Sequence, residues 1–464
     1  MTGNRPAPDG GASPGDGDLL SRLRPPVPVL RIAARLEEAG HETWCVGGAV
    51  RDALLGITHL DWDLATAATP QQVQRLFRRT VAVGIEFGTV GVLDDAGRMH
   101  EVTTFRRDVQ TDGRHAVVQF GASLDEDLAR RDLTINAIAF SPRHRTLHDP
   151  YDGRGDLAGR VIRAVGNPEA RMAEDRLRAL RAIRFAARFG FRIEDSTWTA
   201  IVASAPWMGR LSAERVKQEL DKTFEQVDRA GGALALWRDS GALEALIPAL
   251  ADAPDSLFAA LDCLPMAVGP RAQARRLLRH TILLGHVPSA DLPDLLRALR
   301  FSRAEARMVS KLAGLWRELG DEMGTLLSSS VRPDDITVRR WVARATRLDV
   351  GLLLRVAEAH WAARRADGDS APSSASVRSL HRRALRAAYR DPVAISDLAI
   401  GGEELRQLGV PAGPEMARIL QGLLNVVLVD PTRNTVHCLR SVAVELASRE
   451  LPSAAQDLTE RTGS

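Results

Sequence analysis

The amino-acid sequence predicts an α/β domain at the N-terminus followed by an all-α remainder, and three observations lead to this prediction. Short apolar segments typical of strands alternate with helical patterns only before about residue 165. From Glu169 onward strand patterns nearly vanish, and long segments with helical periodicity continue. The length of 464 residues exceeds what one core usually holds; at about 150 residues per domain it indicates about three domains.

The strand and helix patterns of the N-terminal domain follow one another closely. Strand patterns lie over 43–46, 60–64, 89–93 and 99–104. Helical patterns lie over 28–40, 49–55, 71–77 and 132–140. Residues 106–120 are polar and contain glycine, which predicts a mobile loop, and residues 149–153 predict a turn.

The remaining segments are helical or irregular. Residues 1–28 contain six Pro and five Gly, so we expect a disordered tail there. Helical periodicity continues to about residue 365, and residues 366–376 form a linker or long loop. The helical segment that follows is basic, with Arg378, Arg382, Arg383, Arg386 and Arg390.

Composition excludes several classes of protein. The chain is 45% hydrophobic and 26% charged, which is ordinary for a soluble protein, and no run of 18 apolar residues predicts a membrane span. The N-terminus has no apolar run behind a basic start, so we expect no secretory signal. Cys45, Cys263 and Cys438 are too few and too far apart for a disulfide framework or a cysteine zinc site, which predicts a reducing cytoplasm.

The positive charge comes almost entirely from arginine. The formal net charge is only +3, but of the 62 basic residues only Lys217, Lys222 and Lys311 are lysines. A GC-rich genome would explain this bias, and so would a need for planar, bidentate contacts with phosphate. Local charge separates these explanations better than total charge, because residues 171–192 contain seven arginines against two acidic residues.

The strongest local pattern is Asp61-x-Asp63 on a predicted strand. Side chains at i and i+2 share one face of a strand, and two such carboxylates form a hard oxygen site for Mg²⁺. An isolated pair of this kind is also common as two solvated surface acids. Here Gly47-Gly48 precedes it between a strand and a helix, where backbone amides can approach a phosphate, and Arg51 lies one turn later. The glycine motifs of P-loop and dinucleotide-binding folds are absent.

Five blocks of sequence, in order, resemble the class II tRNA nucleotidyltransferase and poly(A) polymerase family. They are residues 47–52 (GGAVRD), 61–63 (DWD), 130–137 (RRDLTINA), 149–157 (DPYDGRGDL) and 174–185 (EDRLRALRAIRF). The resemblance implies a polymerase-β-like nucleotidyltransferase head with a mixed sheet and helices, followed by an all-α neck, body and tail.

The resemblance also implies a division into domains. We expect a disordered tail over 1–28, the nucleotidyltransferase head over 29–165, and the neck with the nucleotide-selecting helices over 166–235. A helical body would span 236–365, and a helical tail that binds tRNA would span 366–464.

The resemblance assigns catalytic roles to the acidic residues. Asp61 and Asp63 would bind two Mg²⁺ ions that bridge the nucleotide phosphates and activate the attacking 3′-hydroxyl. Glu101, on the strand that begins near Met99, is the expected third carboxylate; alternatively it is a plain surface acid.

Basic residues would bind the triphosphate and the base. Gly48, Arg51 and Arg131 are expected at the triphosphate, although Arg131 could instead form a salt bridge with Asp132 or Asp127. Arg181 and Arg184 are assigned to the nucleotide pocket by the resemblance alone.

Asp175 and Arg178 are expected to select the base, because residues at i and i+3 share one face of a helix. The carboxylate accepts from the amino group of cytosine or adenine, and the guanidinium donates to the adjacent ring nitrogen. Uracil and guanine present a carbonyl and an N–H at these places, so both contacts would be mismatched at a cost of roughly 1–3 kcal/mol each. The alternative is an ordinary surface ion pair.

The implied activity is template-independent addition of CCA to the 3′ end of tRNA, with CTP and ATP as substrates and no protein partner. Ile85 and Glu86 stand where poly(A) polymerases tend to have two basic residues, which favours a tRNA enzyme. The full-length segment 105–120 favours complete CCA addition over CC addition, and addition of A alone stays open. Outside the family, the alternatives are a small-molecule nucleotidyltransferase and a non-catalytic RNA-binding protein.

Overall fold

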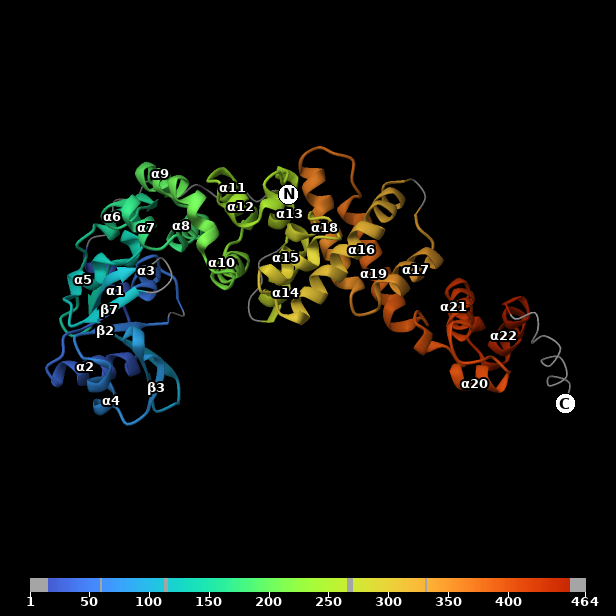
Figure 1. Ribbon diagram of the computed structural model, residues 1–464, viewed down its shortest axis with the longest axis horizontal. Helices are drawn as coiled ribbons and strands as arrows, with labels where there is room; N and C mark the ends of the chain where they lie inside the picture. Colours follow the sequence, from blue (N-terminus) through green and yellow to red (C-terminus); the bar gives the residue numbers. More distant parts are fainter. Residues whose placement is uncertain (1–15, 59–60, 112–115, 265–269, 330–331, 451–464) are drawn as a thin grey trace. The chain divides into compact units, whose positions relative to one another are not determined.

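The chain folds into two compact units, Met1–Ala251 and Asp252–Ser464. The computed structural model describes residues 16–58, 61–111, 116–264, 270–329 and 332–450. Strands occur in the blue to green part of the chain in Figure 1, and from α10 (Ala213–Gln226) onward the regular elements of the described residues are helices. The predicted fold class, an α/β N-terminal part followed by an all-α remainder, is therefore confirmed.

A seven-stranded mixed sheet organises the N-terminal part. Its order is β3 (Thr80–Gly84), β4 (Thr89–Leu93), β5 (Met99–Thr104), β2 (Asp63–Thr66), β1 (Thr43–Val46), β8 (Ala139–Ser141) and β9 (Thr146–His148). β2 and β5 are parallel, with Leu64 opposite Val102, and the other neighbours are antiparallel. The central strands β1 and β2 are buried, which agrees with their apolar composition.

Three helices of the first unit begin and end close to their predicted positions. They are α2 (Val27–Glu38), α3 (Gly48–Leu54) and α4 (Pro70–Leu76). α2 buries Val29, Ile32 and Leu36 at helical spacing. In α4, Thr69 and Gln72 form a reciprocal capping box, which satisfies backbone N–H groups at the start of the helix.

The predicted mobile loop over 106–120 is wrong. Residues Arg106–Thr111 form β6 and Ala116–Phe120 form β7, and the two strands pair antiparallel. Arg107 donates from Nε to the Gln119 side chain across the pair at 2.9 Å. The polar, glycine-containing composition therefore predicted a loop, although the segment forms a hairpin of two paired strands.

The predicted helix over 132–140 is also wrong. A short 3₁₀ turn over Thr134–Asn136 is followed by β8. The Asp132 carboxylate accepts hydrogen bonds from the Leu133 N–H and the Asn136 amide, which favours a turn over a continuing helix. Leu133 through Ser141 are all buried, so the burial pattern has no period that would distinguish a helix from a strand.

The predicted disordered tail over 1–28 is wrong in its second half. Residues 1–15 lie outside the described residues, but Asp16–Arg22 form helix α1. Leu23 is fully buried, and Arg22 donates from Nη1 to the Leu54 carbonyl at 3.1 Å. One apolar anchor and one long-range hydrogen bond thus order a segment whose composition alone predicts disorder.

The rest of the first unit contains short helices and one two-stranded parallel pair, β10 (Val161–Ile162) with β11 (Arg192–Ile193). Its helices besides α10 are α5 (Leu124–Ala129), α6 (Gly153–Gly159), α7 (Pro168–Glu174), α8 (Leu177–Phe189), α9 (Asp195–Ser204), α11 (Ala230–Asp239) and α12 (Ala242–Leu246).

Helices are the regular elements among the described residues of the second unit. Its helices are α13 (Asp255–Asp262), α14 (Pro270–Leu284), α15 (Leu292–Ala298), α16 (Arg303–Ser328), α17 (Asp335–Ala345), α18 (Val350–Ala366), α19 (Ser374–Arg390), α20 (Gly402–Gln407), α21 (Pro414–Val429) and α22 (Val436–Glu450). The predicted linker coincides with the α18–α19 loop, and the predicted basic helix is α19. The domain boundaries at 165, 235 and 365 stay predictions.

None of the helices in the described part of the chain combines the length and the apolar character needed to cross a membrane.

Close packing at the start of α6 gives the first testable prediction. A Cβ at Gly153 would lie 2.3 Å from the Thr134 carbonyl oxygen, so Gly153→Ala is expected to destabilise the first unit by roughly 1–3 kcal/mol. Gly232 is the matched control, because it lies inside α11 and a Cβ added there would meet open space, so Gly232→Ala is expected to be neutral or stabilising. Urea unfolding measures the free energy of unfolding of both variants. Equal effects of the two substitutions would contradict the steric argument.

Candidate active site

A pocket of about 870 Å³ lies within the first unit and is rich in charge. Nine arginine and lysine side chains and four aspartates line it. The lining residues are Gly47, Gly48, Arg51, Asp61, Asp63, Arg130, Arg131, Asp132, Asn136, Asp175, Leu177, Arg178, Arg181, Arg184, Phe185, Arg188, Arg215, Lys222 and Gln226. All predicted site residues except Glu101 are therefore in one pocket, whose volume is in the range of ligand sites.

The acidic side of the pocket is built by the start of β2. Asp63 begins the strand and pairs with Val46, whereas Asp61 precedes the strand and is exposed, so the strand predicted over 60–64 starts later than expected. Trp62, between them, is buried, so the two aspartates still alternate with an inward side chain. Glu101 lies on β5, the parallel neighbour of β2, one position before Val102, which pairs with Leu64.

Burial and nearby negative charge raise the pKa of Asp63 to about 7. Burial is the largest cause, the charges of Glu101 and Asp61 add to it, and Arg131 opposes it. A divalent cation between Asp61 and Asp63 would relieve this repulsion, so these residues fit a hard metal ion.

No preformed cage of three or more His, Cys, Asp or Glu side chains occurs among the residues with described positions.

The side of the pocket at which we expect the triphosphate, called the phosphate side below, begins at Gly47-Gly48. Gly47 has φ +74°, and a Cβ there would lie 3.1 Å from Arg131 Nη1, so glycine allows both the turn and the close approach of this guanidinium. Arg51 is buried; its Nε donates to Asp52 at 2.6 Å and its Nη1 donates to the Asn136 side chain at 2.5 Å. Burial lowers the pKa of Arg51, and the charge of Asp52 opposes this change.

Arg131 forms a salt bridge and also lines the pocket, while its role at the triphosphate stays a prediction. Its Nη2 donates to Asp127 at 3.1 Å, so the alternative of a salt bridge is confirmed with Asp127. The same side chain lines the pocket, where Nη1 donates to the Asn136 carbonyl at 3.3 Å. Asp127 also accepts from Arg130, and these cations hold the pKa of Asp127 low against the opposing effect of burial.

Asp132 connects the phosphate side of the pocket to α8. Its Oδ1 accepts from Asn136 at 2.9 Å, and its Oδ2 accepts from Arg181 Nε at 2.8 Å. Burial would raise its pKa, but the charge of Arg181 and the hydrogen bonds from Asn136 and Arg181 hold the pKa at about 2. Asn136 in turn accepts from Arg51, so the three residues form one continuous network.

The geometry predicted for Asp175 and Arg178 needs correction. Asp175 lies in the break between α7 and α8, and Arg178 lies in the first turn of α8, so the two are not on one helix. Asp175 pairs with Arg215 at 2.6 Å and Arg178 pairs with Glu174 at 2.5 Å, so the alternative of a mutual ion pair is wrong. Both side chains nevertheless line the pocket.

Arg184 is engaged mainly with α10. Its Nε donates to Glu219 at 2.5 Å and its Nη1 donates to Gln226 at 3.0 Å, and the side chain is 4% exposed. Its guanidinium also lies 4.3 Å from the centre of the Phe185 ring, which Arg51 approaches from 4.7 Å. Phe185 therefore supports several of the cations in the pocket.

Sequence reasoning missed part of the pocket wall. Asn136 and Asp132 lie inside a recognised block but had no assigned role, and the residues of α10 belong to no recognised block. The lining residues without a predicted role are Arg130, Asp132, Asn136, Leu177, Phe185, Arg188, Arg215, Lys222 and Gln226. The polar residues of α10 recur at helical spacing, and this pattern was the sequence signal that could have indicated a polar helix face at the pocket.

Two family models match the first unit. The model of the "Poly A polymerase head domain" matches residues 43–163, and the model of the "Probable RNA and SrmB-binding site of polymerase A" matches residues 190–253. A CCA-adding enzyme of Geobacillus kaustophilus is 34% identical over 421 residues, which cover 89% of this chain and 95% of that protein. This chain belongs to the tRNA nucleotidyltransferase and poly(A) polymerase family.

Further relatives agree with this family membership. A CCA-adding enzyme of Enterococcus faecalis is 37% identical over 324 residues, 67% of this chain and 77% of that protein. The crystal structure of the Bacillus stearothermophilus CCA-adding enzyme in complex with CTP has a TM-score of 0.73 and 28% identity, with 92% of this chain and 99% of that chain covered. This member of the family is a nucleotidyltransferase, and the predicted fold and enzyme class are confirmed.

The raised pKa of Asp63 gives the second prediction. The pKa of about 7 in the folded chain lies above the ordinary value of 3.8, so the metal-free protein loses stability as the pH rises from about 4 to 7. Asp63→Asn removes this loss and should raise the free energy of unfolding at pH 8 by roughly 2–4 kcal/mol, with little effect near pH 4. Urea unfolding with a chelator present measures this, with the exposed Asp95→Asn as control. A gain independent of pH would refute the assignment.

Proposed function

We propose that this nucleotidyltransferase adds C, C and A in turn to the 3′ end of tRNA from CTP and ATP, without a template. The single observation that supports this most is the convergence of an acidic pair, glycine and arginine contacts for phosphates, and Asp175 with Arg178 in one pocket. In each step the 3′-oxygen bonds to the α-phosphorus of the nucleotide, its proton is lost, and diphosphate leaves. The two relatives described above, from Enterococcus faecalis and Geobacillus kaustophilus, are CCA-adding enzymes.

Asp61 and Asp63 would hold Mg²⁺ together with phosphate oxygens of the substrate, with Glu101 beside Asp63 as the proposed third carboxylate. Bound there, Mg²⁺ would neutralise phosphate charge and lower the pKa of the attacking hydroxyl. Arg51 and Arg131 would orient the triphosphate, and the backbone at Gly48 would permit its close approach. These roles follow from the chemistry of the donor set.

Arg178 is held by the protein in a way that leaves donors for the base. Nη1 donates to Glu174 and to the Arg171 carbonyl, and Nη2 donates to the Arg130 carbonyl. A guanidinium has five N–H groups, so Nε and one hydrogen of Nη2 are left for a ring nitrogen of cytosine or adenine. Asp175 would accept from the amino group that both bases share.

Arg181 and Arg184 take different parts in this proposal. Arg181 is held by Asp132 beside Phe185 and faces the nucleotide. Arg184 has two donors engaged by Glu219 and Gln226, so we assign it to the wall that supports the pocket.

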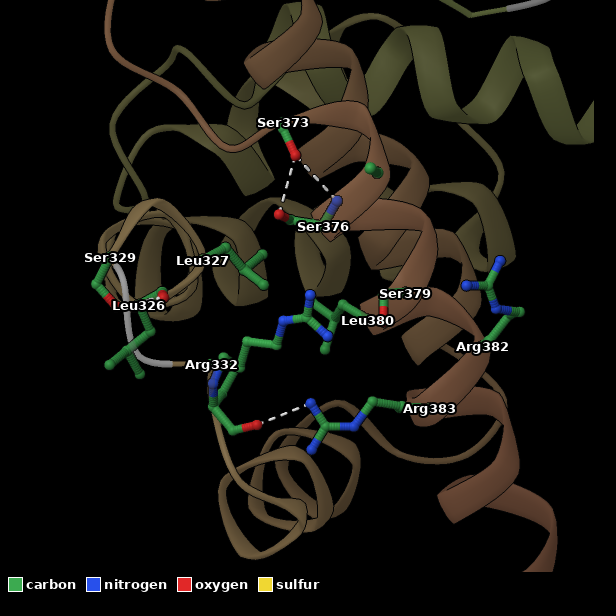
Figure 2. Close-up of a pocket in the computed structure, with 12 residues that line it drawn as sticks. Leu326, Leu327, Ser329, Arg332, Ser373, Ser376, Ser379, Leu380, Arg382 and Arg383 are labelled. Atoms are coloured by element: carbon green, nitrogen blue, oxygen red, sulfur yellow. Dashed lines mark hydrogen bonds between the residues drawn. The ribbon is translucent and has the colours of Figure 1, made fainter.

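The second unit would bind tRNA through its phosphates. Arg378, Arg382, Arg386 and Arg390 are exposed on α19 at a spacing of four residues, which is about 6 Å along the helix per step. A pocket of about 440 Å³ at the start of α19 is lined by Arg332, Arg382, Arg383 and several serines. In Figure 2, Arg332 extends across it toward Leu380, and Arg383 points to the Pro333 carbonyl. Such a surface recognises backbone shape rather than sequence.

The cellular location is part of the proposal. Cys45, Cys263 and Cys438 are free thiols, as expected in a reducing compartment, and we place the enzyme in the cytoplasm.

The third prediction tests the activity itself. With Mg²⁺, CTP and ATP, the purified protein should extend a tRNA lacking CCA by three nucleotides. Asp61→Ala should reduce the rate by more than roughly a hundredfold, because a metal carboxylate is lost, whereas the exposed Asp95→Ala should not. The products formed with both nucleotides present separate the alternatives: extension that stops after CC, addition of a single A only to tRNA that already ends in CC, or a long adenosine tail would replace CCA addition by the corresponding activity.

The fourth prediction concerns α19. Arg382→Ala with Arg386→Ala should raise the KM for tRNA roughly tenfold and leave the KM for CTP unchanged, since two phosphate contacts are lost. The slope of the logarithm of the tRNA binding constant against the logarithm of the salt concentration should become shallower by about 0.7–0.9 for each lost contact. Arg303→Ala with Arg307→Ala, an exposed pair of the same spacing on α16, is the matched control. Equal effects of the two double variants would remove α19 from the RNA-binding surface.

A further inference from the structure

Helix α10 presents a polar face to the pocket. Arg215, Lys222 and Gln226 line the cavity, and Glu219 lies on the same face, one turn after Arg215. The opposite face buries Val216, Leu220 and Phe224, so the helix is packed firmly in the unit. A helix with this arrangement can hold pocket residues in position from behind.

Asp175 receives little support from its own segment. It occupies the break between α7 and α8, where its backbone is extended (φ −152°, ψ 106°). Its Oδ1 accepts from the Leu177 N–H at 3.1 Å, and its Oδ2 accepts from Arg215 Nη2 at 2.6 Å. The contact with Arg215 spans 40 residues of sequence and is the described side-chain contact that fixes the carboxylate.

We propose that Arg215 is a positioning residue for nucleotide selection, acting through Asp175. This proposal rests on the proposed function. Each carboxylate oxygen has two lone pairs, and Leu177 and Arg215 use one on each oxygen. The remaining lone pairs are thereby directed into the pocket, where one accepts from the amino group of cytosine or adenine. Arg215 is a charged donor at 2.6 Å, and charge-assisted hydrogen bonds of this kind are among the stronger contacts that hold a carboxylate in place.

Arg178 is independent of α10, which makes the role of Arg215 separable. Its partners are Glu174 and two carbonyls from outside α10, so loss of Arg215 leaves the ring-nitrogen contact intact. The docking of α10 also does not depend on Arg215, because the buried pair of Arg184 and Glu219 attaches the helix to α8 at 2.5 Å. Variants of Arg215 should therefore fold. They should weaken the contact between Asp175 and the amino group of the base, and they should leave the contact between Arg178 and the ring nitrogen unchanged.

The test is a double-mutant cycle of Arg215→Ala and Asp175→Ala on tRNA lacking CCA. The quantity measured is the ratio of kcat/KM for CTP to that for UTP. Arg215→Ala should lower this ratio roughly tenfold, mainly through the KM for CTP, and Arg215→Lys should restore part of it. In the Asp175→Ala background, Arg215→Ala should have no further effect. Arg210→Ala, whose guanidinium lies over Trp207 and does not line the pocket, should leave the ratio unchanged.

Several outcomes would overturn the proposal. An unchanged ratio in Arg215→Ala, with thermal unfolding as in the wild type, would refute a positioning role. An equal fall of the ratio with and without Asp175 would mean that Arg215 contacts the nucleotide itself. An unchanged ratio in Asp175→Ala would overturn both this proposal and base selection by Asp175. Absence of CTP addition by the wild type would instead defeat the proposed function.

Discussion

The mutual repulsion of the cations in the pocket is the constraint on which the rest of the site depends. Guanidinium groups gathered around one cavity destabilise one another by about 4 kcal/mol per close pair at an effective dielectric constant near 20. Each of the main arginines is paired with an acidic residue that either lines the pocket, as Asp132 and Asp175 do, or lies behind its lining. These pairs are Arg51 with Asp52, Arg131 with Asp127, Arg181 with Asp132, Arg184 with Glu219, and Arg215 with Asp175. The low pKa of Asp132, about 2, reflects this compensation.

These pairs also fix the donors before any substrate binds. A long arginine side chain loses rotamer entropy when it is held, and here that cost is met during folding. Asp132 illustrates the coupling, because it holds Arg181 directly and orients Asn136, which accepts from Arg51. One buried carboxylate thus positions both Arg181 on α8 and, through Asn136, Arg51 on α3.

Local sequence patterns could predict much of the fold and the pocket composition. Strands β4 and β5 begin and end at the predicted residues, and the predicted site residues other than Glu101 line one cavity. The errors arise where a distant contact decides the local structure. The apolar segment before Ser141 becomes β8 because it pairs with β1. Asp175 leaves the helix and pairs with Arg215, 40 residues later, and no local period indicates that contact.

The charge on Asp61 and Asp63 is arranged differently from the charge on the arginines of the pocket. The arginines are compensated by the protein, but Asp61 and Asp63 have Glu101 beside them, and this repulsion together with burial raises the pKa of Asp63 to about 7. Near neutral pH this side of the pocket therefore has too little compensating positive charge, and it favours the binding of a divalent cation. A nucleotide triphosphate that arrives with such a cation supplies positive charge to the acids and negative charge to the arginines at once. Either component alone would satisfy only one side, so we expect binding of metal and triphosphate to be mutually reinforcing.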